Sequence, residues 1–289
     1  MNDVTILTPT YNRAHTLPGL YGSLLRQTSP GFSWLIVDDG SGDDTAALVK
    51  GWQDEGKLDI RYVLRENGGK HRALNTGLPL VETPLTFIVD SDDTLSLDAI
   101  EQVERLHRKY GTRRDLCGYS FFRRMGDGYA TAPLKREEQI GTFAQVRMKG
   151  KLPGDMAEVW FTDVLRRYPF PEFPGERFYS EAGVWLRMSG PYQMVFVSQA
   201  IYLCEYLADG LTKNRRKSQA ASPRGVLDCS AQMMKPQCGV RTNLRGGLRY
   251  CVFARRLGLP FGKAVRESGS AFVAVLCWVP SLLLDKQWA

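Results

Sequence analysis

Three carboxylates lie within four residues at the end of an apolar run. Asp90, Asp92 and Asp93 follow residues 85–89 directly, with Ser91 between the first two. Carboxylates about 4 Å apart repel one another by about 4 kcal/mol at an intermediate dielectric, unless water or a cation lies between them. Oxygen ligands of this kind suit Mg²⁺ or Mn²⁺. The pattern predicts a divalent-metal site, and an Asp-rich turn that caps the next helix is the alternative.

Strands and helices alternate along the N-terminal part of the chain. The predicted strands and helices are, in chain order, residues 4–9, 17–27, 34–37 and 46–53. Alternation of this kind is typical of a parallel sheet, in which ligands bind outside the carboxyl ends of the strands. Three polar loops leave strands at that edge: residues 8–13, 38–41 and 90–93. We therefore expect one site to gather all three loops.

The loop at residues 66–72 also favours an anionic ligand. Gly68 and Gly69 allow close backbone approach, and Lys70, His71 and Arg72 are potentially cationic. A short helix predicted just after the loop would present its N-terminus to phosphate. We expect Gly69, Lys70 and Arg72 to contact such a ligand, and a plain turn is the alternative.

Four ordered motifs together carry a family resemblance. They are VTILTPTYNR from Val4, IVDDGS from Ile36, NGGKHRALNTG from Asn67 and FIVDSDD from Phe87. The set resembles the family 2 glycosyltransferases, whose catalytic domain has the GT-A fold. The resemblance implies an α/β, Rossmann-like, mainly parallel sheet flanked by helices. It also implies an inverting transfer of a sugar from a nucleotide donor to a hydroxyl acceptor.

The resemblance further implies which residues contact the donor. Asp39, with Asp38 beside it, would meet the base, Asp90 would lie near the ribose, and Asp92 would bind the metal that bridges the diphosphate. An acidic group beside the base suits N–H donors, since a carboxylate only accepts hydrogen bonds. The implied nucleotide-sugar-binding residues are Thr8, Pro9, Tyr11, Arg13, Asp38, Asp39, Asp90 and Ser91.

An inverting transfer needs a carboxylate that takes the proton from the acceptor hydroxyl. Many family members carry a Glu-Asp pair at the start of a helix, where this chain has Glu181 followed by Ala182. The usual Asp is therefore missing, and Glu181 is the predicted catalytic base. A helix-capping role for Glu181 is the alternative, and Asp155 and Glu158 are the other candidate bases.

The middle of the chain is less regular. The pattern predicts a helix at residues 98–110, a strand at 116–124, a helix that ends near residue 168 and another at 182–188. Residues 126–154 are rich in Gly, Lys and Arg. We expect either a mobile lid over the site or a plain surface loop there.

The C-terminal part differs in character from the rest. We divide the chain into a GT-A domain at residues 1–212 and a basic, mostly helical extension at 213–289. Residues 270–284 are nearly all apolar, which is short of the about 20 residues that a membrane span needs. Arginines beside an apolar, Trp-bearing end predict docking on an anionic membrane. A helical cap or a dimer element is the alternative, and the oligomeric state stays open.

Composition adds limits on compartment and partners. The net charge of +7 fits an anionic substrate, a nucleic acid or an anionic membrane surface. Six cysteines without a CxxC pair are typical of free thiols in a reducing compartment. The first residues lack a secretory pattern. We therefore expect a cytoplasmic protein, or one peripheral to the inner face of the plasma membrane.

The sequence as a whole predicts a metal-dependent glycosyltransferase in cell-surface polysaccharide or glycolipid synthesis. The expected donor is a UDP- or dTDP-sugar, the acceptor is a saccharide or a lipid-linked molecule, and no nucleic acid is expected. A nucleotidyltransferase acting on sugar phosphates is one alternative, although residues 8–13 contain no glycine. A noncatalytic glycan-binding module is the other, but it would not need clustered acids at a strand end.

Overall fold

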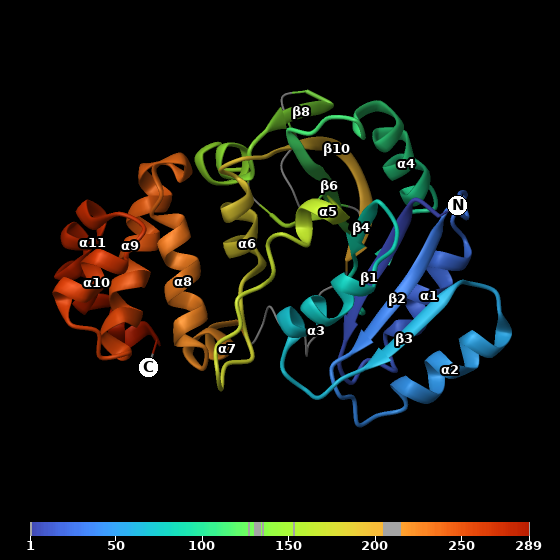
Figure 1. Cartoon of the computed structure of the whole chain (residues 1–289), viewed down its shortest axis with the longest axis horizontal. Coiled ribbons are helices and arrows are strands. Elements are labelled where there is room, and N and C mark those ends of the chain that lie inside the picture. The colour runs from blue at the N-terminus through green and yellow to red at the C-terminus, as the bar shows by residue number, and fades with distance from the viewer. Residues whose placement is uncertain are drawn as a thin grey trace. The chain divides into compact units, whose positions relative to one another are not determined.

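The computed structural model describes residues 2–126, 128–129, 134, 136–152, 154–204 and 215–288 (Figure 1). The chain divides into two compact units. The first unit consists of Met1–Gly141, Leu152–Pro169 and Tyr192–Leu207. The second consists of Thr142–Lys151, Phe170–Pro191 and Ala208–Ala289.

Four neighbouring parallel strands form the N-terminal half of a sheet in the first unit. They are β1 (Val4–Thr10), β2 (Phe32–Asp38), β3 (Ile60–Leu64) and β4 (Leu85–Ile88), in the spatial order β3-β2-β1-β4 (Figure 1). Every residue of β1 is buried. Strict alternation of apolar and polar residues is expected only in a strand with one exposed face. β1 is covered on both faces, and its sequence VTILTPT lacks this alternation.

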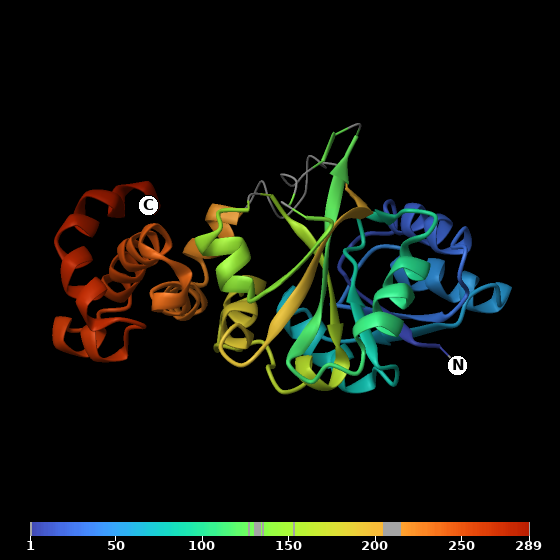
Figure 2. The ribbon, with the colours of Figure 1, turned by 90° about the horizontal axis from the view of Figure 1, so that it is seen from above.

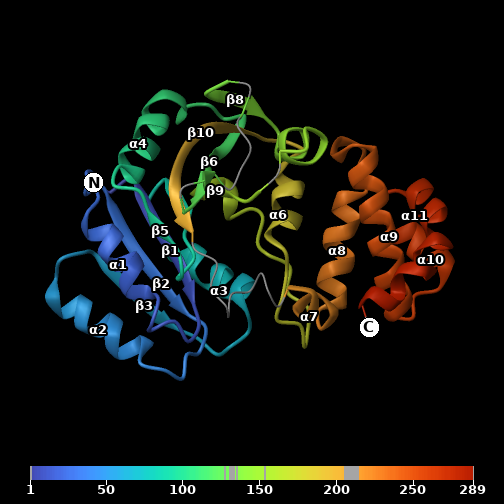
Figure 3. The same cartoon turned by 180° about the vertical axis from the view of Figure 1, so that it is seen from behind.

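Helices cover both faces of these strands (Figures 1 and 3). The helices are α1 (Leu17–Leu25), α2 (Thr45–Glu55), α3 (Lys70–Gly77) and α4 (Ala99–Tyr110), with the 3₁₀ turn η1 (Leu78–Leu80) after α3. α1, α2 and α4 share one core with the strands, in which the Tyr21 and Trp52 rings stack 4.3 Å apart. α3 packs on the other face, where a Cβ on Gly77 would lie 2.5 Å from Leu7 Cδ1. Glycine at 77 therefore permits the close approach of α3 to β1.

The other strands make the sheet a mixed one. They are β5 (Thr94–Leu95), β6 (Leu116–Met125), β7 (Gly128–Tyr129), β8 (Glu138–Gly141), β9 (Met156–Phe161) and β10 (Gln193–Cys204), with the short helix α5 (Thr162–Leu165) after β9. β9 pairs antiparallel with both β4 and β6, whereas β6 and β10 run parallel side by side (Figure 2). The expected parallel sheet is thus confirmed for β1 to β4, and the half beyond β4 is mixed.

The prediction of a loop at residues 126–154 is wrong, because most of the described residues in this range lie in β7, β8 or the helical segment at residues 144–149. β8 pairs with β10, and residues 144–149 form the π-helix η2 (Ala144–Lys149). Glu138 in β8 accepts hydrogen bonds from Lys109 Nζ at 2.7 Å and Tyr110 Oη at 2.6 Å. A charged residue of a kind that is common in loops therefore holds this strand in place. Residues 127, 130–133, 135 and 153 of the predicted lid lie outside the described residues.

The second unit is helical, as expected for the C-terminal region. Its helices are α6 (Glu181–Met188), α7 (Arg215–Ala220), α8 (Pro223–Met233), α9 (Val240–Arg256), α10 (Phe261–Glu267) and α11 (Ala271–Trp278), with 3₁₀ turns η3 (Pro236–Cys238) and η4 (Pro280–Trp288). Met234, Tyr250, Cys251 and Cys277 form part of its core. The unit also takes in Phe170–Pro191. The domain boundary at 212/213 lies outside the described residues and stays a prediction.

Two further expectations concern the C-terminal region and the cysteines. Among the described residues, no helix has both the length and the apolar character needed to cross a membrane. All six cysteines are free thiols. Burial raises the pKa of the Cys117 thiol to about 12, so this group is an inert core residue.

Candidate functional site

The loops after β1 and β2 are joined to each other at the carboxyl edge of the sheet. Asn12 N donates to Ser41 Oγ at 2.8 Å, and Gly42 N donates to Asn12 Oδ1 at 2.8 Å. Ala14 N donates to Asp43 Oδ2 at 3.0 Å. The two loops that the sequence predicted to share a site therefore form one continuous surface.

Asp38 is a buried residue that fixes the second loop. One carboxylate oxygen accepts a hydrogen bond from Ser41 N at 2.8 Å, and the other accepts one from Tyr62 Oη at 2.6 Å. Burial and the bond to Asp38 raise the pKa of Tyr62 well above its ordinary value, so the phenol stays a donor. The side chain of Asp38 is thus directed into the protein.

Asp39 joins the third loop to the first two. Its carboxylate accepts hydrogen bonds from Gly68 N at 3.0 Å and Gly69 N at 2.6 Å, and it forms an ion pair with Arg65. Gly69 has a φ of 99°, a conformation that favours glycine, and α3 begins directly after it. Asp39 therefore shapes the glycine-containing loop, and the predicted contact with the base stays a prediction.

The residues predicted in the first loop differ in exposure. Thr8 and Pro9 are buried in β1, and Thr8 Oγ1 accepts a hydrogen bond from Trp34 Nε1 at 2.9 Å. Tyr11 is 48% exposed, and Arg13 is half-buried with its charge near Asp92. Only Tyr11 and Arg13 of these four therefore present side chains that a ligand could reach directly.

Asp90 is held from two directions. Its carboxylate forms an ion pair with Lys70 of α3, and its backbone N–H donates to Tyr202 Oη at 2.9 Å. Burial alone would raise the pKa of Asp90, but the charges of Lys70 and Arg123 outweigh it and keep the pKa below its ordinary value. Asp90 is therefore ionised, and Ser91 beside it is buried.

The other two acids of the cluster show the opposite shift. Burial, with the negative charge of Asp90 as the next cause, raises the pKa of Asp92. Burial and the same charge of Asp90 raise the pKa of Asp93 to about 7, although Arg123 opposes the shift. A cation at this place would relieve the repulsion among the three carboxylates.

The acids fit Mg²⁺ or Mn²⁺ only if water and substrate phosphates supply the remaining ligands of the ion. Among the described residues, no group of three or more His, Cys, Asp or Glu side chains is arranged to hold a metal ion. Mg²⁺ does not require such a cage, because it is commonly held by one or two carboxylates together with water and substrate phosphates. Asp92 fits that role, because its carboxylate oxygens are hard ligands and a cation would offset the negative charge of Asp90 beside it.

Three residues near the site escaped the sequence analysis. Arg123 lies 4.1 Å from the centroid of the Tyr202 ring and 3.6 Å from Asp93 Oδ2, and Arg65 pairs with Asp39. Tyr202 lies in β10, a strand that the sequence pattern did not predict. Arg65 directly follows β3 and Arg123 lies near the end of β6, and a cation at such a position is a usable signal.

The candidate bases lie in different parts of the chain. Glu181 is half-buried and is the first residue of α6 in the second unit. Its role as the base stays a prediction. In the first unit, Glu158 lies in β9 opposite Ser120, and Asp155 is exposed just before that strand.

The curated proteins and solved structures to which the chain is similar include a polymerase and two structures with bound nucleotide sugars. A teichoic acid poly(glycerol phosphate) polymerase of Staphylococcus epidermidis is 36% identical over 101 residues, which are 35% of this chain and 14% of that protein. The chain thus spans far less than two thirds of that relative's length.

The S. aureus TarS 1-349 complex with UDP-GlcNAc matches with a TM-score of 0.65 at 17% identity, over 100% of this chain and 81% of that one. The mannosyltransferase PcManGT from Pyrobaculum calidifontis, in complex with GDP-Man and Mn²⁺, matches with a TM-score of 0.57 at 17% identity, over 99% and 81% of the two chains. At such identities the likeness shows the fold, which is of the GT-A type. The family model described as glycosyl transferase family 2 matches residues 5–170, more than half of the chain, and the chain therefore belongs to glycosyl transferase family 2.

Proposed function

We propose that the chain transfers a sugar from a nucleotide-diphosphate donor to a hydroxyl acceptor, with inversion at the anomeric carbon. The observation that carries the proposal is the joined set of three loops beside the Asp90–Asp92 acids. Arg13, Lys70 and Arg123 place positive charge around these acids. A nucleoside diphosphate carries negative charge, and an acid cluster with cations beside it suits a metal-bound diphosphate.

The residues divide into roles on the basis of their exposure and contacts. Tyr11, Arg13, Lys70 and Arg72 would contact the donor, and Asp38 and Asp39 would hold the loops that contact its base. Asp92 would hold Mg²⁺ or Mn²⁺, with Asp90 beside it. The bound ion would neutralise charge on the departing diphosphate. The complex of the P. calidifontis mannosyltransferase with Mn²⁺ and GDP-Man supports this choice of cofactor.

Proton removal from the acceptor is the second part of the proposal. An ionised carboxylate must lie within hydrogen-bond reach of the acceptor hydroxyl and accept its proton as the new glycosidic bond forms. Glu181 is our candidate, because it begins a helix at the place where the family carries an acidic motif. Glu158 and Asp155 are the candidates that follow if Glu181 fails.

Acceptor and compartment form the broadest part of the proposal. We assign the chain to cell-surface polysaccharide or glycolipid synthesis, with a UDP- or dTDP-sugar as donor and a saccharide or lipid-linked acceptor. The similarity to a teichoic acid polymerase and to TarS with bound UDP-GlcNAc supports this class. A cytoplasmic site at the inner face of the plasma membrane would give access to both substrates.

A donor panel tests the proposed reaction. The full chain is incubated with UDP-, dTDP- and GDP-sugars, with Mg²⁺ or Mn²⁺ and with EDTA, and the released nucleotide is identified by chromatography. We expect nucleoside diphosphate from at least one donor, and none in EDTA. Nucleoside triphosphate formed from pyrophosphate and the same donors would instead assign the chain as a nucleotidyltransferase. If no nucleotide is released and the chain binds free glycans equally well with metal and with EDTA, the chain is a glycan-binding module.

A further inference from the structure

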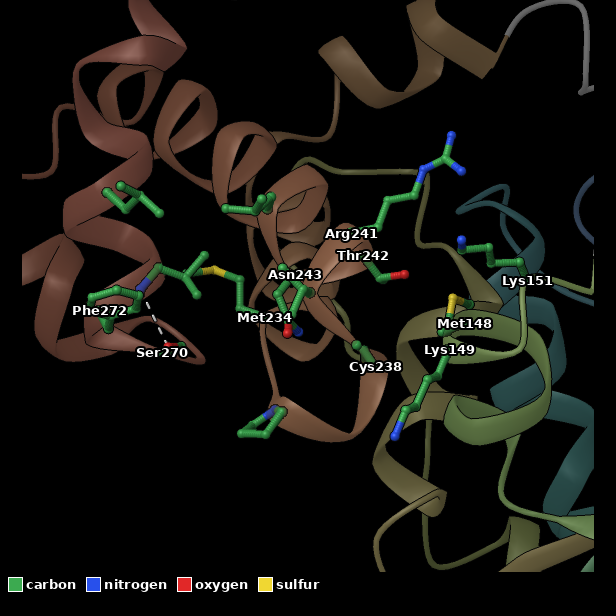
Figure 4. Close-up of a pocket in the computed structure, with 16 residues that line it drawn as sticks. Met148, Lys149, Lys151, Met234, Cys238, Arg241, Thr242, Asn243, Ser270 and Phe272 are labelled. Carbon is green, nitrogen blue, oxygen red and sulfur yellow. Dashed lines mark hydrogen bonds between the residues drawn. The ribbon is translucent and has the colours of Figure 1, made fainter.

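An open pocket of about 690 Å³ lies within the second unit, and its two ends differ in chemistry. The starts of α9 and α11 and the end of η2 contribute its walls. Figure 4 shows Lys149, Lys151 and Arg241 at one end, and Phe272 at the other. None of the described residues that line it is acidic. The pocket therefore offers positive charge beside an apolar surface.

The apolar wall continues onto a larger exposed surface, which we call the α11 face. Phe272 is 77% exposed, Val279 68% and Leu283 83%. The α11 face consists of Phe272, Val275, Leu276, Val279, Leu282 and Leu283. Residues 270–284 include no charged residue. Exposed apolar side chains gathered in one short stretch mark an interaction surface, because water contact with them is unfavourable.

The inward side chains of the same segment explain why the α11 face points outward. Ala274 and Cys277 are buried in the core of the second unit. Gly247 of α9 allows this packing, since a Cβ there would lie 2.9 Å from Cys277 Sγ. α11 is therefore fixed by one side, and Phe272, Val275 and Leu276 on its other side are exposed.

We propose that the α11 face and the basic end of the pocket dock on an anionic lipid bilayer. The apolar side chains would enter the interfacial region, and Lys149, Lys151 and Arg241 would face the phosphate groups of the lipid headgroups. The proposal concerns a surface of the second unit and does not depend on transferase activity.

Charge complementarity favours a bilayer over a second copy of the chain. Two copies that joined through this surface would bring their basic pocket ends together, and the described lining offers no acid to compensate the repulsion. A free phosphate would satisfy the cations but would leave the α11 face in water. An anionic bilayer satisfies both, because it presents phosphates above an apolar layer.

Vesicle flotation of the full chain tests the proposal. The probes are phosphatidylglycerol-containing vesicles and pure phosphatidylcholine vesicles, each at low and high salt. We expect flotation with the anionic vesicles at low salt, reduced by high salt because exposed charges are screened. Absence of binding to the anionic vesicles would overturn the proposal, and so would equal binding to both vesicle types at both salt concentrations.

Matched substitutions locate the binding surface. Arg241→Gln should weaken binding to anionic vesicles about fivefold, the effect of about 1 kcal/mol per cation near such a surface. Phe272→Glu should reduce flotation further, since it places a charge in the apolar layer. The controls are Arg114→Gln and Leu97→Glu, which make the same changes of charge at exposed residues of the first unit. All four variants should keep the wild-type melting temperature, because the replaced side chains are exposed.

Two results would contradict the assignment of the surface. If the controls weaken vesicle binding as much as Arg241→Gln and Phe272→Glu do, the interaction is with the whole basic protein. If light scattering shows a dimer that Phe272→Glu dissociates, while vesicle binding is unchanged, the α11 face belongs to a second copy. Inorganic phosphate and chloride at the same ionic strength should reduce flotation equally, because both act only by screening. A stronger effect of phosphate would assign the basic end of the pocket to free phosphate.

Discussion

At the scale of single residues, the acids of the site fall into two groups. Asp38 and Asp39 have their oxygens occupied by donors of the chain itself, such as Tyr62 and the backbone of Gly69. Asp92 instead has a pKa raised by burial and by the charge of Asp90. Two similar Asp-containing motifs thus differ, because the carboxylates of one hold loops through hydrogen bonds, whereas burial and a neighbouring acid raise the pKa of Asp92 in the other.

Asp39→Asn tests the shaping role. The amide has only one accepting oxygen, and its NH₂ group would face the N–H groups of Gly68 and Gly69. We expect a loss of about 1–3 kcal/mol in the free energy of unfolding, the usual cost of buried donors without acceptors, together with weaker donor binding. Urea unfolding and calorimetric titration measure both. Asp59→Asn, which changes an exposed acid, is the control, and equal behaviour of the two variants would refute the shaping role.

Glu181→Gln tests the proposed base. Loss of a general base lowers the transfer rate by about 10²-fold or more. Loss of a helix cap costs about 1 kcal/mol of stability and leaves the chemistry intact. We expect the first pattern, with donor affinity close to wild type. A lowered melting temperature at an unchanged transfer rate would exclude Glu181 and direct attention to Glu158 and Asp155.

At the scale of elements, local pattern was sufficient for some strands and insufficient for others. β1, β2 and β4 were predictable because each is a short apolar run that ends in a polar loop. β9 and β10 were not, because their apolar runs adjoin helix-like sequence and their partners are distant in the chain. The pairing of β9 between β4 and β6 depends on tertiary contacts that no local pattern contains.

The same limit applies to the site. The acids were predictable because they follow apolar runs, and the loop glycines and Lys70 were predictable because glycine and cationic residues gather at residues 68–72. Arg123 was missed although its position near the end of β6 is a usable signal, whereas Tyr202 could not be predicted, since β10 brings it to Asp90 from 112 residues away in sequence. The hydrogen bond that Thr8 accepts was also hidden, because its partner Trp34 lies on a neighbouring strand.

Tyr202→Phe tests the support that β10 gives to the Asp90 loop. The substitution removes the oxygen that accepts the Asp90 N–H, at an otherwise fully buried ring. We expect about 1–3 kcal/mol lower stability and a weaker donor affinity. Tyr192→Phe, at a half-buried tyrosine whose ring lies 6.3 Å from Tyr168, is the matched control. A loss of stability without any change in donor affinity would show that Tyr202 has only a structural role.

At the scale of the whole molecule, the chain combines two units with different surfaces. The first carries the acid cluster at the edge of its sheet, and the second carries the basic pocket and the α11 face. Residues 268–289 are not a detachable tail, because Ala274 and Cys277 belong to the core of the second unit.

Deletion of residues 268–289 should therefore destabilise the second unit. It removes buried apolar side chains, each of which contributes about 1 kcal/mol or more to folding. We expect a lower melting temperature by calorimetry, whereas Phe272→Glu should leave it unchanged. An unaltered melting temperature after the deletion would mean that the segment is dispensable for folding.

The most direct test of the central claim is the turnover of Asp92→Asn with a donor that the wild-type chain uses. We expect nucleoside diphosphate release to fall to the level seen with EDTA, because the substitution removes a charged oxygen ligand. The melting temperature without donor or metal should equal or exceed that of the wild type, since burial of this carboxylate is unfavourable when it is ionised. Turnover close to wild type in Mg²⁺ or Mn²⁺ would contradict the assignment of Asp92 and of the metal-dependent reaction.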